Sequence, residues 1–92
     1  MKVRYTAEAQ ANLQSIFSYI SERNAPAAMR VLSRLRARAD SLGAFPELGR
    51  ATDRVGIRVL ADGQYPYLVF YTIERDEIVV IHVRHAARKP VR

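Results

Sequence analysis

The spacing of apolar residues in the first half of the chain predicts two amphipathic helices. Thr6 offers a side-chain oxygen as an N-cap, and apolar residues then recur at helical spacing up to about Glu22. Asn24 is a second N-cap, and another apolar stripe runs from it to Gly43. The connection over residues 23–25 is so short that it predicts an antiparallel helical hairpin.

The second half of the chain has the shorter period of β-strands. Residues 56–61, 65–74 and 78–85 are rich in β-branched and aromatic side chains, and Asp-Gly and Arg-Asp pairs between them favour tight hairpins. Residues 2–5 (KVRY) also alternate, whereas residues 45–50 (FPELGR) break all periodicity and predict a turn-rich link. This segregation indicates an α+β fold, in which a short N-terminal strand and an antiparallel helical hairpin pack on an antiparallel β-sheet, in the order β-α-α-β-β-β.

Composition narrows the class of protein. The chain has 92 residues, of which 49% are hydrophobic, so we expect a single packed domain. It has no cysteine, which excludes a disulfide framework, a thiolate zinc site and a cysteine nucleophile. It shows neither a signal-peptide pattern nor an apolar run near the roughly 20 residues that cross a bilayer. We therefore expect a cytoplasmic protein that uses no cofactor and no membrane.

The distribution of charge points to a negatively charged partner. The formal net charge is +6, and residues 23–38 contain five arginines and no acidic residue. The segment from Arg84 to Arg92 contains four basic residues and again no acid. Arginine presents a planar fork of donors that matches carboxylates and phosphates. Such clusters are typical of nucleic-acid binders and of proteins that are masked by an acidic partner.

Three arginines of the second predicted helix lie on one stripe. Arg30, Arg34 and Arg38 recur every four residues beside the apolar stripe. One interpretation is a solvated helix face. The other is a surface that receives an acidic, amphipathic segment of a partner.

Two histidines lie at the end of the last predicted strand. His82 and His85 have opposite parity, so they face opposite sides of the sheet and cannot share a metal ion without a bulge; no metal site is expected. For His82 we expect a backbone or tyrosine partner. His85 is flanked by Arg84 and Arg88, and nearby cations favour the neutral form of an imidazole.

A neutral histidine beside arginines is the minimum needed to cleave RNA, because the 2′-OH must lose a proton and the phosphate needs cationic clamps. His85 is the candidate base, with Arg58, Arg84 and Arg88 as clamps. No residue is an obvious acid for the leaving oxygen. We therefore favour arginines that bind without reacting.

The tyrosines of the longest predicted strand alternate on one face. Tyr67 and Tyr71 could stack on nucleic-acid bases or pack within the sheet. Aromatic residues at a period of two are usual in strands, so packing is the favoured interpretation.

Taken in this order, the segments resemble the ParE branch of the RelE/ParE toxin superfamily, from bacterial type II toxin–antitoxin modules. The resemblance covers nearly the whole chain. It rests on the opening strand followed by AEAQANLQSIFSYI, the second helix ending at SLGAFPELGR, the strand with Arg58, the segment YPYLVFYTI and the ending IHVRHAARKP. It implies one toxin domain over residues 1–92, with a helical hairpin against an antiparallel sheet.

The resemblance also separates two mechanisms. RelE-like members are ribosome-dependent mRNA endonucleases that use basic residues on the sheet and often a tyrosine near the carboxyl end. The corresponding positions here hold Tyr67, Ala86 and Arg92. The resemblance therefore implies a ParE-like inhibitor of DNA gyrase that arrests growth and is neutralised by a ParD-like antitoxin. The alternative is a RelE-like mRNA endoribonuclease that uses the base and clamps named above.

Two sets of contact residues follow from this interpretation. The candidates for target binding lie at the rim of the sheet and are Arg58, Tyr67, Arg84, His85, Arg88 and Lys89. The antitoxin is expected to lay an acidic and apolar segment across the helices and the exposed sheet. Its candidate contacts are Leu13, Phe17, Arg30, Arg34 and Arg38.

Overall fold

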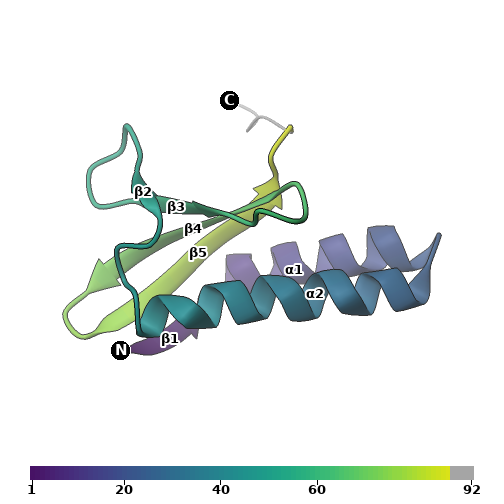
Figure 1. Cartoon of the computed structure of the whole chain (residues 1–92), viewed down its shortest axis with the longest axis horizontal. Helices are drawn as coiled ribbons and strands as arrows, with labels where there is room; N and C mark the ends of the chain where they lie inside the picture. The colour runs from purple at the N-terminus through teal and green to yellow at the C-terminus, as the bar shows by residue number, and fades with distance from the viewer. Residues whose placement is uncertain (88–92) are drawn as a thin grey trace.

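Two helices pack against one face of a five-stranded sheet in the computed structural model, which describes residues 1–87 (Figure 1). The first half comprises β1 (Lys2–Tyr5), α1 (Ala7–Ser21), α2 (Ala25–Asp40) and a 3₁₀ turn, η1 (Ser41–Gly43). The second half comprises β2 (Arg50–Ala51), β3 (Arg58–Ala61), β4 (Tyr67–Glu74) and β5 (Glu77–His85).

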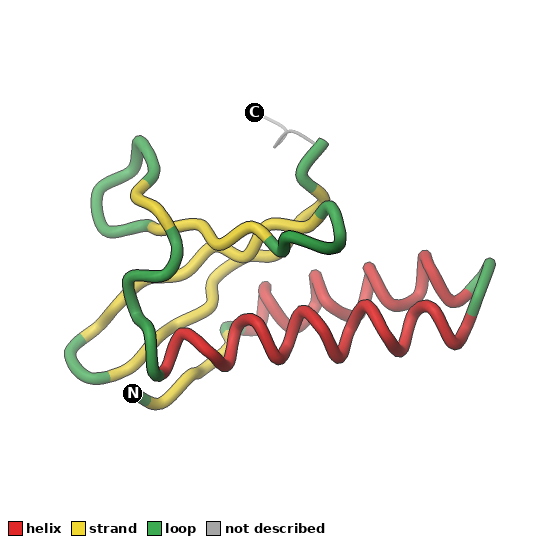
Figure 2. Tube along the Cα trace, in the orientation of Figure 1, coloured by secondary structure: helices red, strands yellow, loops and turns green. Residues whose placement is uncertain are grey.

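The helical hairpin begins where the sequence predicts it. The side chain of Thr6 accepts a hydrogen bond from the N–H of Ala9 at 3.1 Å, and that of Asn24 accepts one from Ala27 at 3.0 Å, so both N-caps are confirmed. The two helices run antiparallel and extend beyond the end of the sheet (Figures 1 and 2). Neither helix among residues 1–87 is both long and apolar enough to span a membrane.

The sheet has the strand order β1-β5-β4-β3-β2. The expected α+β class and the packing of the hairpin on the sheet are confirmed, with two differences. β1 pairs with β5 in parallel, so the sheet is mixed rather than wholly antiparallel. In addition, the end of the segment expected to be a turn-rich link forms the two-residue strand β2, which pairs with β3 at the sheet edge.

The tyrosines of β4 belong to the core, which confirms the packing interpretation. Tyr71 is fully buried, and its hydroxyl donates to the carbonyl of Pro46 at 2.7 Å and accepts from the N–H of Gly49 at 3.0 Å. A Cβ at Gly49 would lie 2.7 Å from the carbonyl oxygen of Val59 and 2.8 Å from the Tyr71 hydroxyl. Tyr71 therefore fixes the loop before β2 by contacts that leave room only for glycine.

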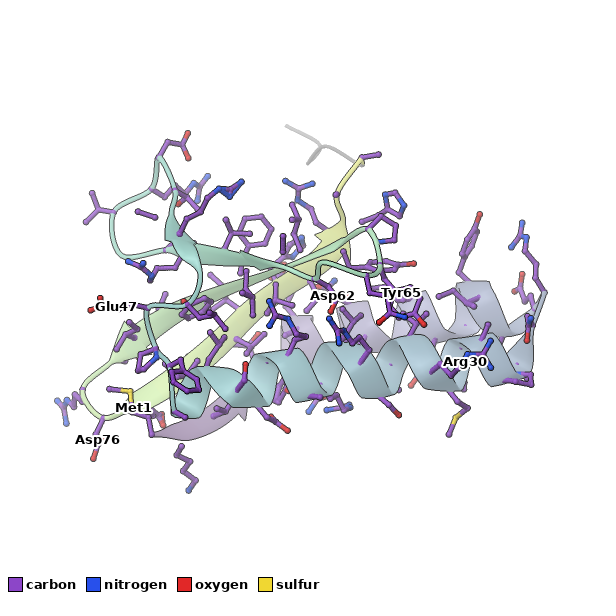
Figure 3. The ribbon with its side chains drawn as sticks, in the orientation of Figure 1. Met1, Arg30, Glu47, Asp62, Tyr65 and Asp76 are labelled. Carbon is purple, nitrogen blue, oxygen red and sulfur yellow. The ribbon has the colours of Figure 1, made fainter. Side chains whose placement is uncertain are left out.

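A buried carboxylate ties α2 to the connection between β3 and β4. The Asp62 side chain is 0% exposed, and its Oδ1 accepts from Nε of Arg34 at 2.8 Å. Nε of Arg38 lies 3.9 Å from the same oxygen. Oδ2 accepts from the backbone N–H groups of Gln64 at 3.1 Å and Tyr65 at 2.8 Å. Asp62 and Tyr65 lie on the part of this connection that is next to α2, while Arg30 lies further along α2 toward the interhelical turn (Figure 3).

These contacts determine how the Asp62 carboxyl titrates. Burial alone would raise its pKa, but hydrogen bonds from the N–H of Tyr65, from Arg34 and from the N–H of Gln64 outweigh that effect and hold the pKa below 3.8. The pKa in the folded state is thus lower than in the unfolded state. The resulting stabilisation is present above about pH 4 and is lost as the pH falls through the folded-state pKa.

Replacement of Asp62 by asparagine tests this clamp. We expect Asp62→Asn to lower the free energy of unfolding by about 1–3 kcal/mol at pH 7, because Arg34 loses its charged acceptor. The difference from wild type should shrink as the pH is lowered toward 3, because the stabilisation by the ionised carboxylate is lost as the pH falls toward its lowered folded-state pKa. Urea unfolding at both pH values measures the effect. A constant difference at all pH values would contradict the role assigned to ionised Asp62.

The Tyr71 hydroxyl gives a second stability prediction. Tyr71→Phe should lower the free energy of unfolding by about 1–3 kcal/mol, because a buried N–H and a carbonyl lose their partner. The dependence of this free energy on urea concentration should be unchanged. Tyr19→Phe, at an exposed tyrosine, is the matched control and should have little effect. Equal stabilities of the two variants would show that the loop is held by something else.

Candidate functional site

A register shift in β5 decides which side chains reach each face of the sheet. Phe70 pairs with His82, but its neighbour Tyr71 pairs with Val80, so Ile81 is the extra residue of a bulge. A strict alternation from Val80 would have pointed His82 toward the helices. Because of the bulge, His82 instead lies on the outer face of the sheet, away from the helices.

Two side chains from the start of α1 satisfy the backbone around this bulge. The hydroxyl of Thr6 donates to the carbonyl of Ile81 at 3.3 Å, and the N–H of Thr6 donates to the carbonyl of Val80 at 3.0 Å. The side-chain oxygen of Asn12 accepts from the N–H of Val83 at 3.0 Å. The backbone groups of Val80, Ile81 and Val83 on the side of β5 that faces β1 and α1 are therefore hydrogen-bonded, which stabilises the bulge.

Beyond the bulge, consecutive residues of β5 alternate between the two faces. Val83 is in the core and His85 pairs with Tyr67, so both lie on the helix-facing side. Arg84 lies on the outer face, with its guanidinium 5.2 Å from the ring centroid of Phe70. The prediction that His82 and His85 face opposite sides is confirmed, and Arg84 is likewise on the opposite side from His85.

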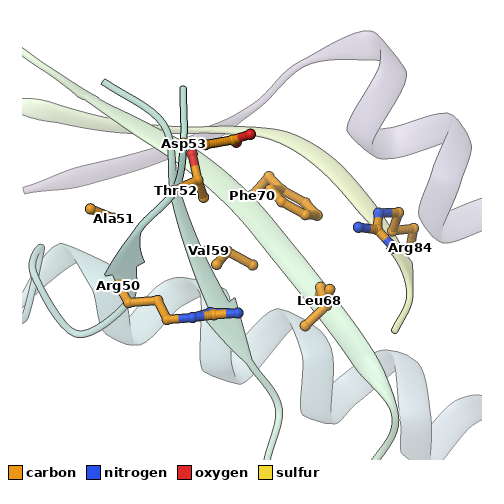
Figure 4. Close-up of a pocket in the computed structure, with 8 residues that line it drawn as sticks. All are labelled: Arg50, Ala51, Thr52, Asp53, Val59, Leu68, Phe70 and Arg84. Atoms are coloured by element: carbon orange, nitrogen blue, oxygen red, sulfur yellow. The ribbon is translucent and has the colours of Figure 1, made fainter. Parts of the chain in front are cut away.

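Two adjoining depressions of about 310 and 420 Å³ form a shallow surface on the outer face, which we call the outer hollow. Its floor comes from β3 and β4, and Arg50 and Arg84 lie at opposite sides of that floor (Figure 4). Thr52, Asp53, Phe70 and Arg84 line both depressions, which makes them one continuous surface. The complete lining is Glu8, residues 50–54, Ile57, Val59, Leu68, Phe70, Ile81, His82 and Arg84.

The outer hollow contains a histidine that is held by a carboxylate. Nδ1 of His82 lies 2.7 Å from Oε2 of Glu8, and the His82 ring lies 5.9 Å from the ring of Phe70. The partner of His82 is thus an acidic residue of α1, and the prediction of a backbone or tyrosine partner was wrong. Glu8 lies 74 positions away in the sequence, and nothing in the strand pattern indicates this contact.

Several predicted target-binding residues make contacts within the fold. Arg58 pairs with Tyr71 on the helix-facing side, and its guanidinium donates to the carbonyl of Gly49 at 2.6 and 3.0 Å. Tyr67 is 8% exposed and belongs to the core, so its ring cannot serve as a stacking platform. His85 packs against Tyr67, and its Nδ1 accepts from the N–H of Ala87 at 3.0 Å. Arg58, Arg84 and His85 therefore do not form one cluster.

The predicted antitoxin contacts divide in a similar way. Leu13 is 2% exposed and lies in the core, so its side chain is not available to a partner. Arg34 and Arg38 contact the buried Asp62. Phe17 is half-buried and Arg30 is exposed on the hairpin. Two further target-binding candidates, Arg88 and Lys89, lie outside the residues that the structure describes.

Two arginines of the outer hollow were not among the predicted site residues. Arg50 is the last residue of the link that was expected to be rich in turns, Arg54 lies just beyond it, and no periodic pattern marks either residue. Across residues 1–87, no carboxylate oxygen lies within 4 Å of either guanidinium. Their position follows from the pairing of Arg50 with Val59, which brings the segment after β2 beside the outer face.

Comparison with known proteins agrees with this architecture. A family model described as the ParE toxin of the type II toxin–antitoxin system parDE matches residues 3–90. Toxin RelE2 of Caulobacter vibrioides is 36% identical over 88 residues, which covers 95% of this chain and 97% of that protein.

Two solved structures share the fold at low sequence identity. One is from the chromosomal ParDE system of P. aeruginosa, with a TM-score of 0.83, 20% identity and coverage of 92% of this chain and 95% of that one. The other is the isolated RelE toxin of E. coli, with a TM-score of 0.69, 14% identity and coverage of 96% and 86%. The family model and the 36% identical relative show that the chain belongs to the ParE toxin family of type II toxin–antitoxin systems, within the RelE/ParE superfamily, and the shared fold agrees with this.

Proposed function

We propose that this toxin binds and inhibits DNA gyrase without cleaving a substrate, and that a cognate ParD-like antitoxin neutralises it in the cytoplasm. The observation that carries the proposal is the separation of the residues expected to cleave RNA. Arg84 and His85 lie on opposite faces of β5, and the Arg58 guanidinium is bonded to the loop before β2. The general base and the cationic side chains must reach the same phosphate group, and His85, Arg84 and Arg58 are not placed to do so.

The partner proposals rest on charge and on the family. A protein with a formal charge of +6 attracts acidic partners and associates with them quickly. The chain shares its fold with a protein of a ParDE system, which supports an antitoxin as the neutralising partner. On the hairpin, the proposal retains Phe17 and Arg30 as antitoxin contacts. At the sheet, it retains Arg84 and His85 as target contacts.

A pair of assays tests the proposed target. Purified toxin should inhibit supercoiling by purified gyrase and should leave mRNA intact in a reconstituted translation reaction. Arg84→Ala should raise the toxin concentration needed for half-inhibition by about tenfold, because a contact to the target is removed. Cleavage of mRNA in the ribosomal A site, with gyrase unaffected, would overturn the proposal.

The His82–Glu8 contact favours a second candidate, a RelE-like mRNA endoribonuclease. A carboxylate that orients an imidazole is a recurring arrangement in general acid–base catalysis. Arg84 lines the same hollow and could hold a phosphate there. This set differs from the one expected from sequence, because it uses His82 in place of His85.

The second candidate makes its own prediction about the two histidines. If the toxin cleaves mRNA, His82→Gln should lower the cleavage rate by about 100-fold or more, because it removes the proposed proton-transfer group. Glu8→Gln should lower the rate less, since it removes only the orienting carboxylate. Rates measured on programmed ribosomes check this. Cleavage that survives His82→Gln, or that is lost only in His85→Gln, would exclude this assignment.

A further inference from the structure

We propose that the outer hollow is the docking site for an extended antitoxin segment in which an apolar side chain is flanked by carboxylates. This inference rests on the proposed function, since it concerns the neutralising partner. It goes beyond the sequence prediction because it uses Arg50 and Arg54 and the floor of the hollow. None of these was among the expected contacts.

The floor of the hollow is apolar and suits a single inserted side chain. Val59 and Phe70 pair across β3 and β4, and Leu68 lies two residues before Phe70 on the same face of β4. The depression above them has a volume of about 310 Å³. A buried aliphatic or aromatic side chain at the centre of an interface typically supplies a large share of the binding energy.

The rim of the hollow carries two arginine side chains that can bind a partner's carboxylates. Arg50 and Arg54 are exposed, and within the described part of the chain neither guanidinium has a carboxylate partner within 4 Å. Each guanidinium offers donors in a fork that matches a carboxylate. Carboxylates on either side of an apolar anchor would therefore meet charge of the opposite sign.

The remaining groups in the lining favour a peptide over a nucleic acid. Asp53 and Glu8 place two carboxylates in the hollow, and these would repel a continuous run of phosphates. The Phe70 ring is already approached by the Arg84 guanidinium at 5.2 Å and by the His82 ring at 5.9 Å, so it is not an open platform for base stacking. An acidic peptide can place its few carboxylates at the arginines alone.

Two arginines of α2, Arg34 and Arg38, are less suited to the same task. Arg34 and Arg38 lie at 2.8 and 3.9 Å from Oδ1 of Asp62, so part of their charge is already balanced within the fold. The outer hollow also contains Arg84, which is retained above as a target contact. An antitoxin segment seated there would cover Arg84 and would neutralise the toxin by occlusion.

Charge reversal at the rim tests the site. The probe is the full-length protein encoded by the reading frame adjacent to the toxin gene, titrated against the toxin at low salt. Arg50→Glu/Arg54→Glu should weaken binding by at least about tenfold, and the loss should shrink at high salt. Arg23→Glu/Arg75→Glu makes the same change in net charge at turns outside the hollow, and it should bind nearly as wild type does.

The outcomes distinguish this site from the proposed function. Equal affinities of the two double variants would overturn the docking site while leaving the antitoxin partnership intact. No binding to the wild-type toxin would overturn the partnership, and the docking site with it. Loss of binding to a single-stranded RNA probe in the rim variant, with antitoxin affinity unchanged, would assign the hollow to nucleic acid instead.

A measurement on the wild-type complex makes the test independent of the variants' folding. Hydrogen–deuterium exchange should slow in residues 50–57 and 68–70 when the antitoxin binds, because a docked segment would cover the amides that border the hollow. Protection restricted to the helical hairpin would overturn the proposal.

Discussion

The bulge in β5 is the constraint on which the arrangement of the functional surfaces depends. One extra residue, Ile81, reverses the alternation of the strand, so that Val83 enters the core while His82 and Arg84 reach the outer face. A strand without it would direct these two polar side chains into an apolar interior, at a cost of several kcal/mol each. The bulge persists because Thr6, the N-cap of α1, bonds to the carbonyl of Ile81 and Asn12 of α1 bonds to the N–H of Val83.

Hydrogen bonds of buried or half-buried polar side chains also fix other segments of the molecule. The Tyr71 hydroxyl holds the loop before β2, and Arg58 donates to the same loop from β3. Asp62 joins α2 to the β3–β4 connection through Arg34. The contacts of Tyr71 and Asp62 join residues that are distant in sequence, and each contact sets the position of a segment that borders a charged surface. A domain of this size has a small core, so such contacts carry a substantial share of its specificity.

The sequence predicts the elements well because they depend on local periodicity. Both N-caps, the helical hairpin, the main strands and the core role of Tyr67 and Tyr71 follow from patterns that span a few residues. The parallel pairing of β1 with β5 does not, because periodicity identifies a strand without naming its neighbour. The bulge cannot be predicted from the sequence either, because residues 78–83 are apolar at most positions and fit either register.

The candidate site was harder to predict because its parts come from four separate segments. His82 meets Glu8 only after β1 and β5 have paired, and Arg50 reaches the outer face only through the pairing of β2 with β3. The order of the segments correctly indicated the toxin family, but the positions of the charged side chains in the structure did not follow from their clustering in the sequence. Arg34, Arg38 and Arg58 belong to clusters or strands that looked functional, and they contact groups of the fold itself.

The most direct test of the account is an NMR measurement of the faces of β5 in the wild-type protein. The bulge predicts a slowly exchanging Val83 amide, nuclear Overhauser contacts from the Val83 methyl groups to the helices, and contacts from the His82 ring to Phe70. Contacts from the His82 ring to the core side chains of α1, together with a rapidly exchanging Val83 amide, would show that the strand has no bulge. The assignment of the outer surface would then be contradicted.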